Sequence, residues 1–248
     1  MNRPVLLLAA AAALSQDARQ IVDEAQHRNR TDSQRYEGVL QVIDAKRKIS
    51  EKRWQYDRVG AYGNSKAVLR FTDPPLVRGV ALLVVNHPDR ASDQWMWTPE
   101  LQRDRRIALQ DRSTRFFGTD FTFEDLEERD ADQSDYKLLG EETLDGQACW
   151  KIESRPKQAR NSQYSRVTLW IRKDNYVYVR LDLYVREELV KRCLYRNIQK
   201  VQNVWTPLEL EMADLRKSSR TVMKMDKLEF NLPLKEENFT LQALRRGL

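Results

Sequence analysis

The side chains best suited to catalysis or metal binding are few in this sequence and lie far apart. The chain contains two histidines, His27 and His87, and two cysteines, Cys149 and Cys193. A Ser-His-Asp hydrolase needs a histidine beside a nucleophile and an orienting carboxylate, and no G-x-S-x-G turn accompanies His87. The cysteines have no CxxC spacing and no neighbouring histidine, so the sequence gives no support to zinc or redox chemistry. We predict no catalytic residue, no metal site and no cofactor, and we keep a hydrolase of envelope lipids as a third alternative.

The densest group of carboxylates lies in the middle of the chain. It consists of Glu124, Asp125, Glu127, Glu128, Asp130 and Asp132. The spacing does not follow the Asp-x-Asp-x-Asp-Gly pattern of a calcium loop. The segment from Phe121 to Arg129 reads as a short acidic helix or turn, and we expect its early carboxylates to be solvated and to favour the helix N-terminus. A calcium site or a surface for a partner protein is the alternative.

Large aromatic residues form a second group with two interpretations. They are Trp54, Trp95, Trp97, Phe116 and Phe121. Such side chains gather wherever one face of a sheet is shielded from water, so they are typical both of a filled core and of a cavity for an apolar ligand. The sequence does not separate these two possibilities.

The elements that must position these residues are mainly β-strands. From Tyr36 almost to the C-terminus the apolar residues recur with a period of two, for example Leu181, Leu183 and Val185. Short turns such as 144–146 and 173–175 connect sequential neighbours as hairpins, which leaves no room for crossover helices. We predict a mainly β fold with a curved antiparallel meander sheet of about ten strands.

The apolar face of such a sheet needs a cover, and the sequence offers little to cover it. One short helix precedes the strands, with Ser15 or Asp17 as its N-cap and an apolar face that starts at Ala18 and Ile21. The segments near Pro74 and Phe121 are the other candidates. Because these covers are small, we expect a partly unfilled apolar cavity.

The N-terminus resembles an export signal. Residues 1–15 combine a positively charged start, an apolar run and a small-residue end, and the run is too short to span about 30 Å of hydrocarbon. We therefore predict a signal peptide over 1–15, a periplasmic location, and a single β domain over 16–248.

The charge and the cysteines support the same setting. The net charge of +6 comes from 43 basic and 37 acidic residues that are spread along the chain, which predicts transient contact with a membrane surface and no nucleic-acid binding. Export permits a disulfide, but the strand pattern places two strands between Cys149 and Cys193, so we expect both thiols to remain unpaired.

One motif in the middle of the chain resembles a family signature. Residues 118–126, Gly-Thr-Asp-Phe-Thr-Phe-Glu-Asp-Leu, are similar to the Gly-Ser/Thr-Asp-Phe-x-Tyr-Glu-Asp-Leu signature of the outer-membrane lipoprotein-sorting family, the LolA-like proteins, with Phe123 in place of Tyr. The signature loop comprises Gly118, Thr119, Asp120, Phe121, Glu124, Asp125 and Leu126. Four further segments match the family in the same order, namely 94–101, 170–174, 205–212 and 239–240.

The resemblance implies a half-barrel around a hydrophobic cavity, with short helices as lids. It also implies carriage of an acylated lipoprotein or another lipid, delivered by an inner-membrane transporter of the RND or MMPL type. No local motif identifies a lid-closing arginine. Our hypothesis for the lipid-contacting residues is Trp54, Tyr56, Leu69, Phe71, Trp95, Trp97, Leu169, Ile171 and Leu181.

The main rival hypothesis is an envelope interaction module that carries no lipid. In that case the interior is simply core, and the exposed strands or the acidic segment 124–132 bind a partner. A tightly filled interior would favour this hypothesis.

Overall fold

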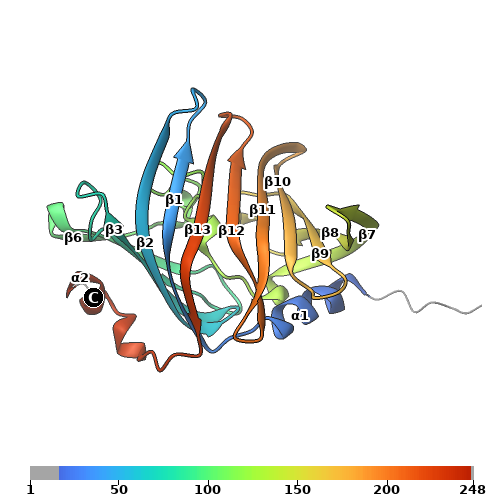
Figure 1. Ribbon diagram of the computed structural model, residues 1–248, viewed down its shortest axis with the longest axis horizontal. Coiled ribbons are helices and arrows are strands. Elements are labelled where there is room, and N and C mark those ends of the chain that lie inside the picture. Colours follow the sequence, from blue (N-terminus) through green and yellow to red (C-terminus); the bar gives the residue numbers. More distant parts are fainter. Residues whose placement is uncertain (1–16, 247–248) are drawn as a thin grey trace, which may run out of the picture.

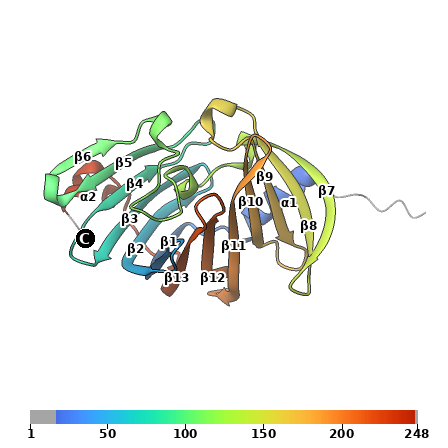
Figure 2. The same ribbon diagram turned by 90° about the horizontal axis from the view of Figure 1, so that it is seen from above.

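The computed structural model describes residues 17–246, so the predicted signal peptide lies outside the described residues. Within them the chain forms one sheet of thirteen strands, all antiparallel to their neighbours, which confirms the predicted mainly β fold (Figure 1). The sheet is open and curved, and Figure 2 shows its strands arranged along an arc from β6 to β7.

The strands fall into two groups. The first group is β1 Ser33–Ile43, β2 Ile49–Ala61, β3 Asn64–Asp73, β4 Ala81–Val85, β5 Asp93–Thr98 and β6 Arg103–Arg106. The second group is β7 Ser134–Leu144, β8 Gln147–Pro156, β9 Arg166–Arg172, β10 Tyr178–Val185, β11 Glu188–Val201, β12 Val204–Asp214 and β13 Ser219–Phe230. The helices are α1 Ala18–Arg28 and α2 Leu241–Arg246, with short 3₁₀ turns at 99–101, 109–111, 124–126, 131–133, 159–161 and 236–238.

The strand order corrects the prediction of one continuous meander of about ten strands. The order is β6-β5-β4-β3-β2-β1-β13-β12-β11-β10-β9-β8-β7, so two meanders meet where β1 pairs with β13. Residues 107–133, which we call the crossing segment, carry the chain from one sheet edge to the other. The short strand β6 was missed because its sequence, Arg-Asp-Arg-Arg, has no apolar alternation.

The junction between the two meanders requires a close approach of backbones. The β1–β13 register shifts between Glu37 and Gly38, and a Cβ atom at Gly38 would lie 1.9 Å from the carbonyl oxygen of Lys224. Only glycine fits there, which is typical of a bulge within a strand.

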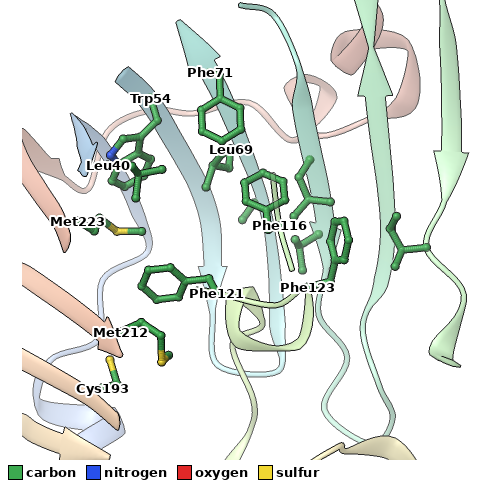
Figure 3. Close-up of a cluster of buried hydrophobic side chains, with 14 of the residues drawn as sticks. Leu40, Trp54, Leu69, Phe71, Phe116, Phe121, Phe123, Cys193, Met212 and Met223 are labelled. Carbon is green, nitrogen blue, oxygen red and sulfur yellow. The ribbon is translucent and has the colours of Figure 1, made fainter. Parts of the chain in front are cut away.

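The inner, concave face of the sheet holds the largest hydrophobic cluster. In this cluster, residues from both meanders pack against the crossing segment, which contributes Phe116, Phe121 and Phe123. Figure 3 shows these rings beside Phe71 and Leu69 of β3, and the rings of Phe71 and Phe116 stack at 5.4 Å between centroids. The crossing segment, which includes the predicted cover near Phe121, therefore covers the concave face at this end.

Helix α1 covers the same face at the other end. Asp17 caps it by accepting a hydrogen bond from the Arg19 backbone N–H, as one of the two predicted caps. Its buried residues Ala18, Ile21, Val22 and Ala25 pack with Ile152 and Ile171 of β8 and β9. The predicted apolar face of the helix is thus confirmed.

The outer, convex face is covered only locally. Helix α2 and the residues before it pack on β4 and β5, where Phe239 and Leu244 contact Trp97 and Leu83. Strand β4 lies within the apolar run 79–85, and its residues Ala81 to Val84 are buried.

Candidate cavity for an apolar ligand

A cavity of about 520 Å³ lies on the concave face. This volume falls in the range of ligand sites, roughly 300–1,000 Å³. Its wall comes from strands of both meanders, from Ala25 and Gln26 of α1 and the following Asn29, and from the crossing segment through residues such as Phe121 and Leu126. The interior is thus not completely filled by side chains of the described residues, which agrees with the inference that the covers are too small.

Tyrosine is the most frequent residue type in the cavity wall. Seven of the nine tyrosines in the chain line it, namely Tyr36, Tyr56, Tyr62, Tyr136, Tyr164, Tyr178 and Tyr195. Tyr36 and Tyr56 are cross-strand partners whose rings stack at 4.9 Å, and Trp54 packs edge-on against Tyr36 at 5.9 Å. Burial raises the pKa of Tyr136 to about 12 and raises the pKa of Tyr36 and Tyr178 well above the ordinary value, so these hydroxyls stay neutral.

The structure brings together five of the nine residues predicted to contact lipid. Trp54, Tyr56, Leu69, Leu169 and Leu181 all line the cavity. Leu169 and Leu181 are partners across β9 and β10, and Tyr56 and Leu69 are partners across β2 and β3, so each pair lies on one face.

Two other predicted residues lie on the concave face but beneath covers. The Phe71 ring is fully buried and packs against Phe116 and Phe117 of the crossing segment. Ile171 is fully buried in the cluster beneath α1.

Trp95 and Trp97 are on the wrong face of the sheet to line the cavity. Both belong to the convex-face cluster with α2, while Met96, between them, packs on the concave side. Since successive side chains of a strand point to opposite faces, an error of one residue in choosing the inward-facing positions places every side chain of the strand on the wrong face. The sequence shows the alternation of β5 but not which set points inward.

The signature loop holds the crossing segment against the sheet. Asp120 is fully buried and accepts hydrogen bonds from Ser219 Oγ at 2.5 Å and from Thr221 Oγ1 at 2.8 Å. Arg115 also donates to Asp120 at 2.5 Å. Gly118, with φ of +73°, provides the turn before this carboxylate, and Thr119 Oγ1 donates to the carbonyl of Phe116 at 2.6 Å.

The early carboxylates of the acidic cluster are buried and paired, contrary to the expectation of a solvated helix, whereas Asp132 is exposed. Asp125 accepts from Lys191 Nζ at 2.7 Å and from Tyr164 Oη at 2.7 Å. Glu124 pairs with Arg129 at 2.6 Å, and only a single 3₁₀ turn forms over 124–126. The partners come from strands and loops 5 to 66 residues away in the sequence, which local patterning does not indicate.

Several wall residues were not identified from the sequence. Arg58 is the least expected, because it is charged and only 3% exposed. It lies two residues after Tyr56 and four after Trp54 along β2, on the same face of the strand, so the spacing of two is the sequence signal that could have identified it. Its Nη2 donates to Thr31 Oγ1 at 2.9 Å, and its Nε lies 3.4 Å from Glu128 Oε1.

The histidines and cysteines take no part in the cavity wall. His87 Nε2 lies 3.0 Å from Asp93 Oδ2 and 2.7 Å from Arg90 Nη2, in an ion-pair cluster next to β5. Cys149 on β8 and Cys193 on β11 are both buried and unpaired, with β9 and β10 between them, as predicted. Among residues 17–246, no group of three or more His, Cys, Asp or Glu side chains is arranged to hold a metal ion.

The sheet, its covers and the cavity define a LolA-like half-barrel. A family model described as "-like: Uncharacterized protein" matches residues 63–246, which is more than half of the chain, and the chain belongs to that family. No curated protein matches the sequence.

Solved structures share the fold over nearly the whole chain. A domain from Vibrio parahaemolyticus described as an outer membrane lipoprotein-sorting protein is 24% identical, with a TM-score of 0.88 over 92% of this chain and 98% of that chain. A DUF1329 family protein from Desulfovibrio piger is 26% identical, with a TM-score of 0.87 over 92% and 97% of the two chains. A LolA superfamily protein from Nitrosomonas europaea is 20% identical, with a TM-score of 0.72 over 92% and 100%.

In the part of the chain that the structure describes, neither helix has the length and apolar character needed to cross a bilayer.

Proposed function

We propose that this protein is a periplasmic carrier, which binds a lipid or the acyl chain of a lipoprotein in the cavity and transfers it toward the outer membrane. The observation that carries this proposal is the cavity of about 520 Å³ on the concave face, lined by apolar and tyrosine side chains of both meanders. A solid core would need no such space, since protein interiors are normally close-packed.

The energetics of an acyl chain suit this cavity. Burial of each methylene group contributes about 0.8 kcal/mol, so a long chain is held firmly when it leaves water. A carrier must also release its cargo, and a wall built from separate elements provides a route. Helix α1 and the crossing segment both contribute to the wall, so displacement of either element widens the cavity.

Delivery and location belong to the same proposal. An inner-membrane transporter of the RND or MMPL type would load the cavity, and the net charge of +6 favours transient contact with anionic membrane surfaces. The first 15 residues would direct export and be removed.

The interaction module remains the rival. The described sheet is open, and β6 and β7 are its edge strands, where backbone groups are free to pair with a partner strand. The acidic segment is less suited to this role than the sequence indicated, because Glu124 and Asp125 are buried and paired.

The test is native mass spectrometry with organic extraction of the protein purified gently from periplasm. A reproducible bound lipid or acylated peptide supports the carrier. A clean apo mass, with no lipid uptake from an envelope extract, favours the interaction module.

A matched pair of variants links any bound lipid to the cavity. Leu181→Glu places a charge in the wall and should abolish lipid co-purification, whereas Leu139→Glu changes an exposed leucine of β7 outside the wall and should retain it. Retention of lipid by folded Leu181→Glu would contradict the proposed site.

A further inference from the structure

The charged residues of the cavity wall are predominantly acidic, although the whole protein is basic. Two arginines, Arg58 and Arg129, line the cavity. The acidic residues of the wall are Asp125, Glu127, Glu128 and Asp130. The described wall contains no lysine or histidine, so its own residues carry a formal charge of −2 while the chain carries +6. Two of its carboxylates, Asp125 and Glu127, pair with Lys191 and Arg112, which lie outside the wall.

Both arginines of the wall already have carboxylate partners. Arg129 Nη2 lies 2.6 Å from Glu124 Oε1, and its Nε lies 3.5 Å from Glu127 Oε2. Arg58 lies 3.4 Å from Glu128 and its side chain is only 4% exposed. Its other hydrogen-bond acceptors among residues 17–246 belong to Thr31. Both guanidinium charges therefore already face a carboxylate, although the contact of Arg58 Nε with Glu128 is an ion pair without a hydrogen bond.

Glu128 is held in the position that pairs it with Arg58. Its second carboxylate oxygen accepts from Ser65 Oγ at 2.9 Å and from the Tyr62 backbone N–H at 3.1 Å. The Glu128 backbone N–H donates to Asn86 Oδ1 at 3.3 Å. Because these contacts come from β3, from the turn before it and from the residue that follows β4, the pair is part of the folded frame.

The wall nevertheless offers uncharged hydrogen-bond donors. Within residues 17–246, the hydroxyls of Tyr36, Tyr62 and Tyr178 make no hydrogen bond to another protein group. Burial raises the pKa of Tyr36 and Tyr178 well above the usual value, which keeps these donors protonated. A hydroxyl donor in an apolar cavity is best matched by a neutral acceptor such as an ester, amide or hydroxyl oxygen.

We propose that the cavity selects neutral amphiphiles with ester, amide or hydroxyl groups over anionic ones, and that the Glu128 carboxylate enforces this choice by occupying Arg58. An anionic head inside the cavity loses its hydration without gaining a free cation, because the cations of the wall and those beside it are already paired with carboxylates. The neutral acyl esters and amides of a glycerolipid or of an acylated cysteine meet no such penalty. This inference rests on the proposed carrier function.

The test is a competition on delipidated full-length protein at pH 7.5, with bound lipid read by native mass spectrometry. The two competitors are 1-palmitoylglycerol and 1-palmitoyl lysophosphatidate, which differ by one phosphate. Wild-type protein should prefer the neutral lipid by at least about tenfold, because a buried anion without a partner is costly. A third probe, a dipalmitoylglyceryl cysteine with blocked termini, separates a lipoprotein anchor from a free glycerolipid by its relative affinity.

One variant tests the role assigned to Glu128. Glu128→Gln keeps an acceptor for Ser65 and the Tyr62 N–H but frees Arg58, so the preference should move toward lysophosphatidate by about tenfold. Glu100→Gln removes the same charge from an exposed turn outside the wall and should leave the preference unchanged.

The outcomes separate this inference from the carrier proposal. Equal binding of the two lipids, or a preference for lysophosphatidate, in wild-type protein overturns the selectivity while leaving the carrier intact. A Glu128→Gln variant with wild-type preference overturns the role of Glu128. Binding of none of the three probes by wild type overturns the carrier proposal as well. If Glu128→Gln does not fold by circular dichroism, the wild-type ratio decides the selectivity.

Discussion

Asp125 and Lys191 form a buried ion pair across the concave face, with 2.7 Å between Oδ2 and Nζ. Their side chains are 2% and 8% exposed, and they lie 66 residues apart in the sequence. Asp125 belongs to the signature loop and Lys191 to β11, so the pair ties the crossing segment to the second meander. A buried pair of this kind is sensitive to the loss of one partner, because the other charge is left in an apolar environment.

Removal of the lysine should therefore destabilise the fold more than removal of both charges. We expect Lys191→Met to lower the free energy of unfolding by about 3–5 kcal/mol, and the double variant Asp125→Asn, Lys191→Met to recover part of that loss. Urea unfolding measures both values. Lys137→Met, at an exposed position of β7, is the control and should change stability little. Equal effects of Lys191→Met and Lys137→Met would show that the pair does not hold the crossing segment.

Asp182 should make stability depend on pH in the acid range. Burial raises the pKa of this carboxyl, but hydrogen bonds from Arg180 and Arg192 outweigh burial and hold the pKa below its usual value. Since the folded-state pKa is below the unfolded value of about 3.9, the stabilisation is complete above that pH and is lost as the pH falls through the folded-state pKa.

The variant Asp182→Asn isolates this contribution. At pH 7 it should be less stable than wild type by about 1–3 kcal/mol, since it loses charge-assisted hydrogen bonds. The difference should shrink as the pH falls below about 4 in a series of urea titrations. A difference that stays constant down to pH 2 would contradict this assignment.

The two cysteines should react slowly with thiol reagents in the folded state. Burial raises the pKa of Cys193 to about 12 and also raises the pKa of Cys149, so little thiolate is present at pH 8. Ellman's reagent should label neither thiol of the native protein within minutes and both after unfolding in guanidinium chloride. Fewer than two thiols in the unfolded protein would reveal a disulfide instead.

The convex-face cluster should stabilise the protein without contributing to lipid binding. Phe239 is buried against β4 and β5, and Arg70 Nη2 donates to the Leu244 carbonyl at 2.9 Å. We expect Phe239→Ala to lower the free energy of unfolding by about 3–5 kcal/mol. Lipid bound per folded protein, measured by native mass spectrometry, should equal that of wild type. Lipid loss from the folded variant would indicate that this face also contacts the cargo.

The sequence by itself determined the strand content and several local features. The period of two, the turns and the apolar face of α1 follow from side-chain spacing, which depends only on local backbone geometry. The separation of Cys149 from Cys193 by two strands also followed, because sequential hairpins place neighbouring strands side by side. The five predicted residues that line the cavity lie on β2, β3, β9 and β10, and in each of these strands the alternating residues chosen from the sequence are those that face the concave side.

The features that depend on contacts between residues far apart in the sequence were determined only by the tertiary structure. The β1–β13 pairing joins segments at opposite ends of the chain, and no local signal distinguishes it from a simple meander. The inward set of β5 depends on where α2 packs, so Met96 rather than Trp95 faces the concave side. The burial of Asp120 and Asp125 likewise depends on Thr221 and Lys191, which reach these carboxylates only when the two meanders have joined. Alternation along a strand gives two sets of side chains, and long-range packing chooses which of them faces the cavity.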